Sequence, residues 1–363
     1  MKRVSFITIH FGSNFGSILQ TIATSEVLKS LNNDVTCINY IQNRWTLKQY
    51  FSVSNPLRLI KRIIFSPVEL ANRYIYQNFL KKYVKLSKAI YRNDNFIKKC
   101  PNSDYYITGS DQVWNSKHNL GIDEHYYFAG FPKHVKKIAY AASIGQDAIS
   151  DEEYNKVKQL LSAYTHISVR ENSAKKIIKT MGYNVEHLLD PTFMLSSKEW
   201  EKYMSKRIVK SPYILVYAPY DVTDIDLVYK SAREIAKQKN LKVVTFSWNL
   251  RRESRADKTI LFANPGDFLS LMYYADYVIT TSFHGTAFSV NLNKKFCVYF
   301  PKGFSTRIKS ILELCNLEER IVNSDDIITL EKITKEIDYS YVNNVLAIER
   351  NKSIEFLKTA LAE

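Results

Sequence analysis

The sequence of 363 residues lacks any long apolar run, and no stretch approaches the roughly 20 residues that a membrane-spanning helix needs. It also shows no N-terminal signal segment, because a strand pattern, Val4 to His10, begins at once. Its four cysteines are scattered and form no CxxC pair, which favours buried reduced thiols over disulfides or zinc ligation. These absences together predict a cytoplasmic protein.

Positive charge is present in excess, with 51 Lys and Arg against 36 Asp and Glu, a net charge of +15. The excess is concentrated between Arg58 and Cys100, where eleven basic residues stand against two acidic ones. Within that stretch, residues 57–65 mix basic and apolar side chains at helical spacing. Such a helix is typical of proteins that lie on an anionic membrane surface. The alternative is a solvated helix that packs its apolar stripe on its own domain. No nucleic-acid-binding motif is present, so nucleic acid is not expected as a partner.

Strand and helix patterns alternate along the chain twice over, which is typical of doubly wound α/β domains. We expect two Rossmann-like domains that face each other across a cleft. The first is predicted at 1–200, with a mostly helical basic insertion at about 45–100, and the second at 201–341. A last helix, 342–363, is expected to pack back across the domains. Strands are predicted at 3–10, 35–40, 105–108, 137–142 and 167–169, then at 213–217, 243–247, 277–281 and 297–300.

Ligands of such sheets bind outside the carboxyl ends of the strands, so the loops at those ends form the candidate site. The first loop, GSNFGSILQ at 12–20, has two glycines four apart that let backbone amides approach a ligand oxygen. It has neither the lysine of a P-loop nor the GxGxxG spacing. A tight strand-to-helix turn is the alternative. The candidate substrate-binding residues here are Gly12, Asn14, Gly16 and Gln20.

The second loop, TGSDQVWN at 108–115, concentrates polar groups directly after an apolar strand. Asp111 is a candidate catalytic residue, because its carboxylate can accept a proton from a sugar hydroxyl. Trp114 can stack on a sugar face. The alternative makes Asp111 a helix N-cap and Trp114 part of the core. The candidate substrate-binding residues are Ser110, Gln112, Trp114 and Asn115.

Arg170 follows the third strand-end, at 167–169, where its guanidinium can grip a carboxylate or a phosphate. A salt bridge with Glu171 or with Asp190 is equally compatible with the spacing. Arg170 is therefore a candidate ligand-binding residue, with a purely structural salt bridge as the alternative.

The fourth junction, TTSFHGT at 280–286, joins the strand ending at 281 to a helix predicted from 287 to 292. A helix start presents unpaired N–H groups and a positive dipole end, and a histidine there can move protons to or from a bound anion. The alternative is a histidine that only caps the turn. The candidate residues are Ser282, His284, Gly285 and Thr286, with Arg307 as a second basic group further on.

Five segments, GSNFGSILQ, GSDQVWN, SVRE, DPTF and TSFHGTAFSVNL, resemble the polysaccharide pyruvyl transferase family in order and spacing, over about residues 3–320. The resemblance implies a fold like that of the GT-B glycosyltransferases. It implies transfer of the pyruvyl group of phosphoenolpyruvate onto two hydroxyls of one sugar, giving a cyclic ketal and phosphate. It further implies a role in exopolysaccharide or capsule biosynthesis, a sugar or lipid-linked oligosaccharide acceptor, a place at the inner face of the membrane, and no metal or organic cofactor.

Position by position, the resemblance makes His284 the family's motif histidine and Arg170 its donor-binding arginine, and it puts Asp111 in the family's aspartate-containing loop. These three are the expected catalytic residues, and either His284 or Asp111 is the acid. The chain departs from the family at Ser282, where many members carry arginine. The donor is then held differently, for instance by Arg307, or the activity is altered or absent. The alternatives are a GT-B-like glycosyltransferase that uses a nucleotide sugar and a catalytically silent glycan-binding relative.

Overall fold

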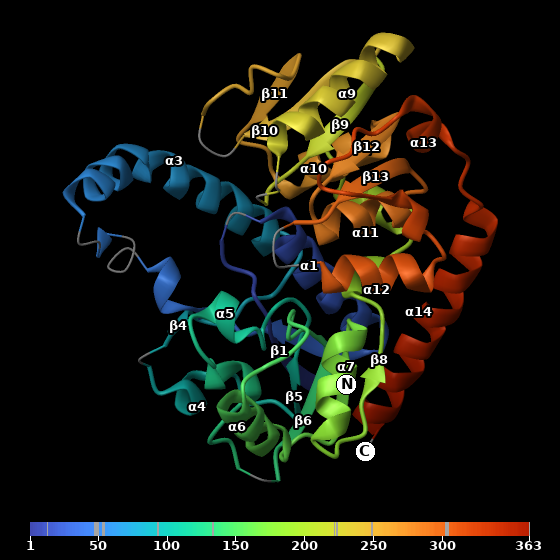
Figure 1. Cartoon of the computed structure of the whole chain (residues 1–363). Coiled ribbons are helices and arrows are strands. Elements are labelled where there is room, and N and C mark those ends of the chain that lie inside the picture. Colours follow the sequence, from blue (N-terminus) through green and yellow to red (C-terminus); the bar gives the residue numbers. More distant parts are fainter. Residues whose placement is uncertain are drawn as a thin grey trace. The chain divides into compact units, whose positions relative to one another are not determined.

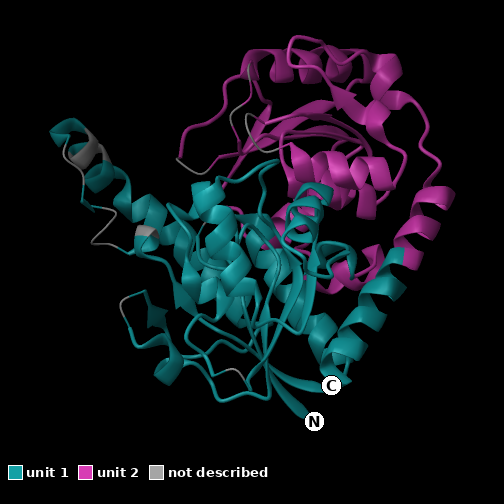
Figure 2. Ribbon diagram, turned by 60° about the horizontal axis from the view of Figure 1, so that its bottom comes forward, with its two compact units in different colours: residues 1–194, 349–363 teal, residues 195–348 magenta. Residues whose placement is uncertain are grey.

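The computed structural model describes residues 1–12, 14–46, 51–52, 55–92, 94–132, 134–220, 222, 224–247, 250–301 and 305–362. The chain divides into two compact units (Figure 2): unit 1 contains residues 1–194 and 349–363, and unit 2 contains residues 195–348. The last helix, α14 (Tyr339–Ala362), contributes residues to both units.

Unit 1 is built on a six-stranded sheet in which every pair of neighbouring strands is parallel (Figure 1). The strand order is β2-β1-β5-β6-β7-β8. β5 is buried along its whole length, as expected for a parallel strand covered on both faces. The strands are β1 (Lys2–Ile7), β2 (Asn33–Cys37), β5 (Tyr105–Thr108), β6 (Lys136–Ala142), β7 (His166–Val169) and β8 (Glu186–His187), and β3 (Tyr40–Ile41) pairs separately with β4 (Ile90–Tyr91).

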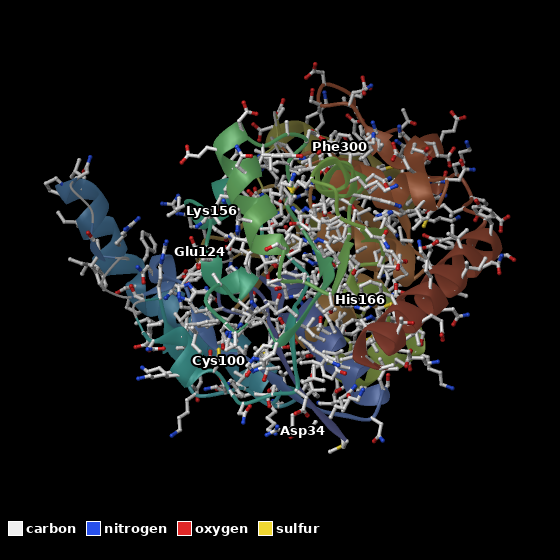
Figure 3. The ribbon with its side chains drawn as sticks, turned by 90° about the horizontal axis from the view of Figure 1, so that it is seen from below. Asp34, Cys100, Glu124, Lys156, His166 and Phe300 are labelled. Carbon is white, nitrogen blue, oxygen red and sulfur yellow. The ribbon has the colours of Figure 1, made fainter. Side chains whose placement is uncertain are left out.

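The helices of unit 1 alternate with these strands, and the central one, α1, is almost completely buried. Surface helices are fixed by caps and ion pairs: Ser150 accepts the backbone N–H of Glu153 at the start of α6. Lys156 of α6 pairs with Glu124, 2.6 Å away (Figure 3). The helices are α1 (Phe15–Ser30), α3 (Pro56–Lys81), α4 (Phe96–Lys99), α5 (Ser116–Asn119), α6 (Asp151–Leu161) and α7 (Asn172–Thr180), with 3-10 turns η1 (Asn43–Trp45), η2 (Glu124–Tyr127) and η3 (Pro191–Phe193).

Unit 2 repeats this architecture with the parallel order β11-β10-β9-β12-β13-β14. Its strands are β9 (Tyr213–Tyr217), β10 (Lys242–Ser247), β11 (Lys258–Leu261), β12 (Tyr277–Thr280), β13 (Lys295–Tyr299) and β14 (Ile321–Val322). Its helices are α8 (Ser197–Trp200), α9 (Ile225–Lys239), α10 (Pro265–Tyr274), α11 (Phe283–Asn291), α12 (Thr306–Leu314) and α13 (Leu330–Thr334), with 3-10 turns η4 (Glu201–Tyr203) and η5 (Glu318–Arg320). Two parallel six-stranded α/β sheets confirm the doubly wound class predicted from the alternating patterns.

Each sheet has one point where the strand order reverses, and such a switch point is where ligands of α/β sheets bind. In unit 1 it lies between β1 and β5, and in unit 2 between β9 and β12. The loops that leave β1, β5 and β12 at these points are three of the four loops singled out in the sequence. The topology therefore indicates that the carboxyl edge of each sheet is a candidate ligand-binding site.

The basic insertion predicted at about 45–100 contains α3, α4 and the short strand β4 in its described residues. All four cysteines are free thiols, and three of them are buried, Cys37, Cys297 and Cys315. Among the described helices, none combines the length and the apolar content needed to cross a membrane.

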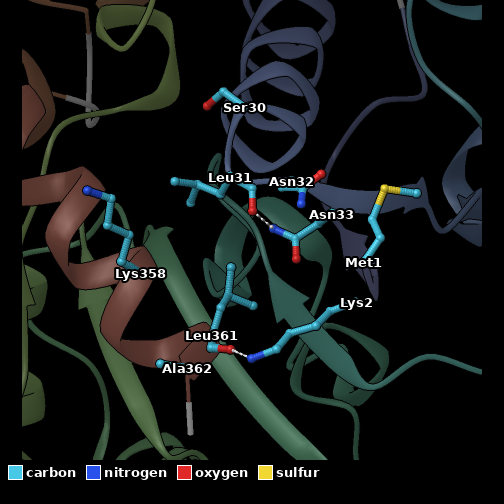
Figure 4. Close-up of a pocket in the computed structure, with 9 residues that line it drawn as sticks. All are labelled: Met1, Lys2, Ser30, Leu31, Asn32, Asn33, Lys358, Leu361 and Ala362. Atoms are coloured by element: carbon cyan, nitrogen blue, oxygen red, sulfur yellow. Dashed lines mark hydrogen bonds between the residues drawn. The ribbon is translucent and has the colours of Figure 1, made fainter.

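A cavity of about 510 Å³ opens at the opposite edge of the unit 1 sheet, where β1 begins and α1 and α14 end (Figure 4). Lys2, Asn33 and Lys358 are among its lining residues, and Lys2 donates to the backbone carbonyl of Leu361. No residue of the four loops lines it, so it is separate from the candidate site.

Candidate functional site

Three of the four loops meet in unit 1 around Arg170, whose side chain is completely buried. Its Nη2 donates to Oδ1 of Asp111 at 3.1 Å, and its Nη1 donates to Oδ2 of Asp190. From the first loop, the Ser17 hydroxyl donates to Oδ2 of Asp111 at 2.6 Å. These contacts bring the loops after β1, β5 and β7 together at one edge of the sheet.

Asp111 occupies a constrained position within this group. Its φ of 72° lies in the left-handed region, which a residue with a side chain rarely adopts and which is enriched at functional sites. The backbone N–H of Gln112 donates to its Oδ1 at 2.8 Å. The predicted alternative of a helix N-cap is wrong, because the cap of the following helix, α5, is Asn115. Three groups, from the loops after β1, β5 and β7, thus hold one carboxylate in place.

Two further carboxylates complete what we call the Arg170 cluster, defined as Arg170, Asp111, Asp190 and Glu171. Asp190 caps the turn η3 and also accepts from the Ser110 hydroxyl at 3.0 Å. Glu171 Oε2 lies 4.0 Å from Nε of Arg170. Its Oε1 accepts from the backbone of residues 144 and 145, each at 2.9 Å. The salt bridge that the sequence offered as the alternative for Arg170 is therefore present.

The Arg170 cluster carries one cation and three carboxylates in a buried setting. Burial by itself lowers the pKa of Arg170, but the neighbouring carboxylates, Asp190 first and then Asp111 and Glu171, outweigh it, and the net effect raises the pKa. Arg170 stays charged, and the group as a whole keeps an excess of negative charge. This excess of negative charge repels a dianion, whereas it favours neutral hydroxyl ligands and positive charge that develops during a reaction.

The other predicted residues of the first loop fix the backbone. Gln20 is completely buried, and its Nε2 donates to Thr8 Oγ1 at 2.8 Å and to the Ser17 carbonyl at 3.0 Å. Asn14 caps α1 by accepting from the N–H of Ser17, and Gly16 is buried in the first turn. Gly12 has a φ of +126°, and a Cβ there would lie 3.1 Å from the indole of Trp45. In its described residues the loop is thus the tight strand-to-helix turn that the sequence offered as the alternative, and Ser17 reaches from it to Asp111.

The second loop divides between the cluster and the core. Ser110 and Asp111 belong to the contacts around Arg170. The Gln112 side chain accepts from Asn115 at 2.7 Å. Trp114 is 2% exposed and stacks on Tyr127, with ring centroids 5.3 Å apart and planes 10° apart. The structure therefore places the indole in the core of unit 1, which was the alternative to stacking on a sugar.

In unit 2, the fourth loop joins β12 to α11 at the switch point. The helix begins at Phe283, four residues before the predicted start, so His284 lies in its first turn. Ser282 takes the N-cap position without a side-chain cap bond, and Thr286 Oγ1 donates to the carbonyl of Ser282 at 3.0 Å. The first N–H groups of a helix have no intrahelical acceptors, so this end presents donors and a positive dipole.

Gly285 lets this helix start approach the sheet. A Cβ at position 285 would lie 2.1 Å from Oγ1 of Thr280 and 2.9 Å from the ring of Tyr217. These distances are far below van der Waals contact, so no larger residue fits without movement of α11. The glycine therefore sets the height of the helix end above β9 and β12.

Phe283 contacts both the following residue, His284, and Arg307. The ring centroids of Phe283 and His284 are 5.1 Å apart, and Cζ of Arg307, from α12, lies 5.3 Å from the Phe283 centroid. Arg307 and His284 are each 3% exposed. Unit 2 thus places a guanidinium, an imidazole and a helix N-terminus at one edge. The guanidinium and the helix N-terminus can bind an anion, and the imidazole can donate a proton to it.

A cavity of about 410 Å³ lies beside this edge, where β9 and β10 end. Ala218, Phe246 and the exposed Arg251 and Arg252 are among its lining residues. None of the residues predicted from the sequence lines it. The two arginines follow β10 in an irregular segment, which offered no motif to single them out.

Sequence reasoning also missed the part played by Ser17 and gave Asp190 only a structural role. Ser17 stood inside a quoted loop, but its partner Asp111 is 94 residues away. Asp190 was considered in the sequence as a salt-bridge partner of Arg170 and as part of the DPTF segment, but not as a member of the site. Both join the site through tertiary contacts that no local pattern encodes.

Two solved structures with a similar architecture are UDP-N-acetylglucosamine 2-epimerases. The chain resembles UDP-N-acetylglucosamine 2-epimerase from Rickettsia bellii with 11% identity and a TM-score of 0.53, over 99% of this chain and 96% of that one. It resembles UDP-GlcNAc 2-epimerase from Neisseria meningitidis, bound to UDP-GlcNAc, with 13% identity and a TM-score of 0.52, over 99% and 100%. Identities this low show the fold alone, which is GT-B-like.

The particular family is given by sequence. The family model for polysaccharide pyruvyl transferase matches residues 14–299, and the chain belongs to that family. Membership makes it a transferase. No curated protein matches the sequence.

Proposed function

We propose that this protein transfers the pyruvyl group of phosphoenolpyruvate onto two hydroxyls of one sugar, forming a cyclic ketal and releasing phosphate. The observation that carries the proposal is the family match over residues 14–299. The acceptor is proposed to be a sugar in a lipid-linked oligosaccharide precursor of an exopolysaccharide or capsule, modified at the inner face of the membrane. Phosphoenolpyruvate is the only co-substrate required.

The reaction needs one proton donor, one base and a receptor for a dianion. A proton adds to the methylene carbon of phosphoenolpyruvate, and positive charge develops at the neighbouring carbon that carries the phosphate. One sugar hydroxyl attacks that carbon and loses its proton to a base. The C–O bond to phosphate breaks, the second hydroxyl attacks the same carbon, and its proton leaves with the phosphate or the solvent. The product is a ketal, with no change in oxidation state.

The donor is proposed to bind at the edge of unit 2. Arg307 and the N–H groups at the start of α11 supply positive groups for its carboxylate and phosphate. His284, in the first turn of α11, is proposed as the acid that protonates the methylene carbon. Many family members carry an arginine where this chain has Ser282. Arg307, which contacts the neighbouring Phe283, is proposed to supply that positive charge instead.

Asp111 is proposed as the base for the attacking hydroxyl, at the edge of unit 1. Its ion pair with Arg170 favours the carboxylate form, which is the form a base requires. The resemblance assigns donor binding to Arg170. The three carboxylates around its guanidinium instead support a positioning role, in which Arg170 acts through Asp111. Ser110, Gln112 and Asn115 are proposed to line the acceptor side.

The direct test incubates the full chain with phosphoenolpyruvate and a panel of lipid-linked sugars. Phosphate release is measured, and mass spectrometry identifies the acceptor that gains a pyruvate unit. We expect one phosphate for each ketal formed. An Asp111→Asn variant is expected to bind phosphoenolpyruvate normally and to form ketal at a rate at least about 10² lower.

A second candidate function is suggested by the cavity at the ends of β9 and β10, where Phe246 offers an aromatic face and Arg251 a cation. Those groups suit a nucleotide sugar, as a GT-B-like glycosyltransferase would bind. Thermal shift separates the two, because a ligand stabilises the protein that binds it. Stabilisation by phosphoenolpyruvate favours pyruvyl transfer, and stabilisation by a nucleotide sugar favours glycosyl transfer. Binding of acceptor without release of phosphate would favour a silent glycan-binding relative.

A further inference from the structure

Helix α3 displays an unusual concentration of exposed apolar side chains. Sixteen large apolar residues are exposed in the described part of the chain, and seven of them lie on this one helix. Leu57 is 71% exposed, Ile64 62% and Tyr74 69%, so most of each side chain meets solvent. Surfaces of this kind commonly mark contacts with a protein or a membrane. The seven are Leu57, Ile60, Ile63, Ile64, Phe65, Leu70 and Tyr74.

Six of the seven fall on one face of the helix. At 3.6 residues per turn, all except Phe65 lie within an arc of about 140° around the helix axis. This face is called the α3 stripe and consists of Leu57, Ile60, Ile63, Ile64, Leu70 and Tyr74. The stripe runs over more than four turns, which is long enough to act as a continuous surface.

The C-terminal half of the same helix makes contacts with unit 1, where Tyr76 and Arg73 lie opposite the stripe and Gln77 lies beside its edge. Tyr76 is 1% exposed and stacks on Phe15, with ring centroids 5.2 Å apart. The Gln77 side chain donates to the carbonyl of His10 at 2.9 Å, and Arg73 donates to the carbonyl of Trp45 at 2.7 Å. The sequence offered as the alternative a helix that packs its apolar stripe on its own domain, but the stripe residues are exposed and these contacts come from other residues of α3.

The helix continues through a proline at its middle. Pro67 has no N–H to bond the carbonyl of Ile63, four residues earlier. The Ser66 hydroxyl donates to that carbonyl at 2.9 Å and satisfies it. The half that carries most of the stripe projects from the rest of unit 1 in both views (Figures 1 and 2).

Charge identifies the occupant of this surface. The stretch from Arg58 to Cys100 has eleven basic and two acidic residues, and α3 itself has five basic residues against Glu69. An apolar stripe on a basic helix matches the interface of an anionic bilayer, where apolar side chains enter the acyl boundary and cations meet the headgroups. We propose that α3 lies on an anionic lipid surface through the α3 stripe.

A second copy of the chain is a poorer partner for the stripe. Pairing two α3 helices would bring two strongly basic segments together, and like charges at close range repel. Anionic lipid instead neutralises the same charge. Because Gln77 and Tyr76 tie α3 to the loop after β1, the proposal also brings the acceptor edge of unit 1 close to the lipid. The lipid contact stands independently of the chemistry proposed above.

The test is a vesicle flotation assay with the full chain. Vesicles contain phosphatidylcholine with phosphatidylglycerol, or phosphatidylcholine alone. We expect co-flotation with the anionic vesicles, weaker association with the neutral ones, and loss of binding as salt is raised. Replacing two stripe residues, Ile60→Ser with Ile64→Ser, is expected to lower the vesicle partition coefficient at least about tenfold. The matched control, Ile348→Ser, removes an isoleucine that is 58% exposed on unit 2 and should change nothing.

A variant that lacks two positive charges of α3 tests the electrostatic contribution to vesicle binding separately from the apolar one. Lys61→Gln with Arg62→Gln is expected to weaken binding to anionic vesicles about tenfold, since each basic residue near the surface contributes severalfold. The control, Lys230→Gln with Lys237→Gln, changes two exposed lysines of α9 and should bind like the natural protein.

Three results would overturn the proposal. The first is a natural protein that stays with the soluble fraction in the presence of anionic vesicles. The second is a stripe variant that floats as well as the natural protein. The third is a stripe variant whose melting temperature falls, or whose mass in light scattering drops from dimer to monomer, because the stripe is then covered by protein. Ketal formation is measured separately in detergent-solubilised acceptor, so failure of one proposal leaves the other to be judged by its own assay.

Discussion

The guanidinium of Arg170 and the carboxylate of Asp111 form a buried ion pair, with Nη2 and Oδ1 3.1 Å apart and with side chains 0% and 7% exposed. The pair joins the end of β7 to the loop after β5, 59 residues earlier in the chain. It fixes the carboxylate of Asp111, a residue whose backbone is in the left-handed region.

Removing the cation from the Arg170 cluster should destabilise unit 1. Arg170→Met leaves three carboxylates buried without their common partner, and losses of this kind are about 3–5 kcal/mol of unfolding free energy. Urea unfolding checks the value. Lys85→Met breaks an exposed pair with Asp34 and should cost less than about 1 kcal/mol. Equal effects of the two variants would show that the burial of the cluster has no energetic consequence.

The kinetic role of Arg170 can be separated from donor binding. Arg170→Lys keeps the charge but loses the planar fork that holds two carboxylates, so Asp111 should lose its orientation. We expect kcat to fall by at least about tenfold with the KM for phosphoenolpyruvate unchanged. Steady-state kinetics with phosphoenolpyruvate as the varied substrate checks this. A raised KM with normal kcat would return Arg170 to the donor-binding role that the resemblance implies.

His284 is expected to be essential for turnover. His284→Ala removes the proposed acid at the start of α11 and should lower kcat by roughly 10² or more. Phosphate release under saturating substrates measures it. His134→Ala, at an exposed turn, is the control and should keep full activity. Near-normal turnover of the His284 variant would remove this residue from the mechanism.

Gly285 should tolerate no side chain. The Cβ of Gly285→Ala would meet Thr280 Oγ1 at 2.1 Å, so α11 must shift from the sheet. Overpacking of this kind lowers stability by about 1–3 kcal/mol. Thermal unfolding of the variant gives the loss, and phosphoenolpyruvate binding should weaken because the helix end moves. A variant as stable as the natural protein would mean that the approach of α11 to β12 is looser than these distances.

Acid should destabilise unit 1 in a range set by two histidines, the buried His10 and the half-buried His187. Burial lowers the pKa of His10, more than its hydrogen bonds raise it, and burial likewise lowers the pKa of His187. The unfolded chain therefore takes up protons near the ordinary value of 6.5 while the native state stays neutral, so unfolding becomes easier as pH falls from about 7.5 to 5.5. Each histidine contributes at most about 1.4 kcal/mol per pH unit. Urea unfolding across this range should give a smaller slope for His10→Gln than for the natural protein.

Much of the fold could be predicted from the sequence because buried parallel strands are continuous apolar runs. The strands at 105–108 and 213–217 have the predicted limits. The edge strands β8, β11 and β14 were not predicted, since two to four residues such as Glu186–His187 carry no apolar run. The start of α11 was placed four residues late because Phe283 to Thr286 read as a turn.

The candidate site was predictable in position and less so in detail. Strand ends and topology identified the loops that hold Asp111, Arg170 and His284. The partner of a charged residue depends on tertiary contacts, so the sequence left Arg170 open between a ligand and a salt bridge. Whether Trp114 faces a sugar or the core depended on Tyr127, 13 residues further on, which no local pattern connects to it.

Mass spectrometry of the acceptor after reaction with phosphoenolpyruvate shows whether the carboxylate that Arg170 holds in place is needed for ketal formation. We expect the natural protein to add one pyruvate unit per phosphate released, and we expect Asp111→Asn, folded and able to bind phosphoenolpyruvate, to add almost none. An acceptor that gains pyruvate equally fast with the Asp111 variant would contradict this expectation.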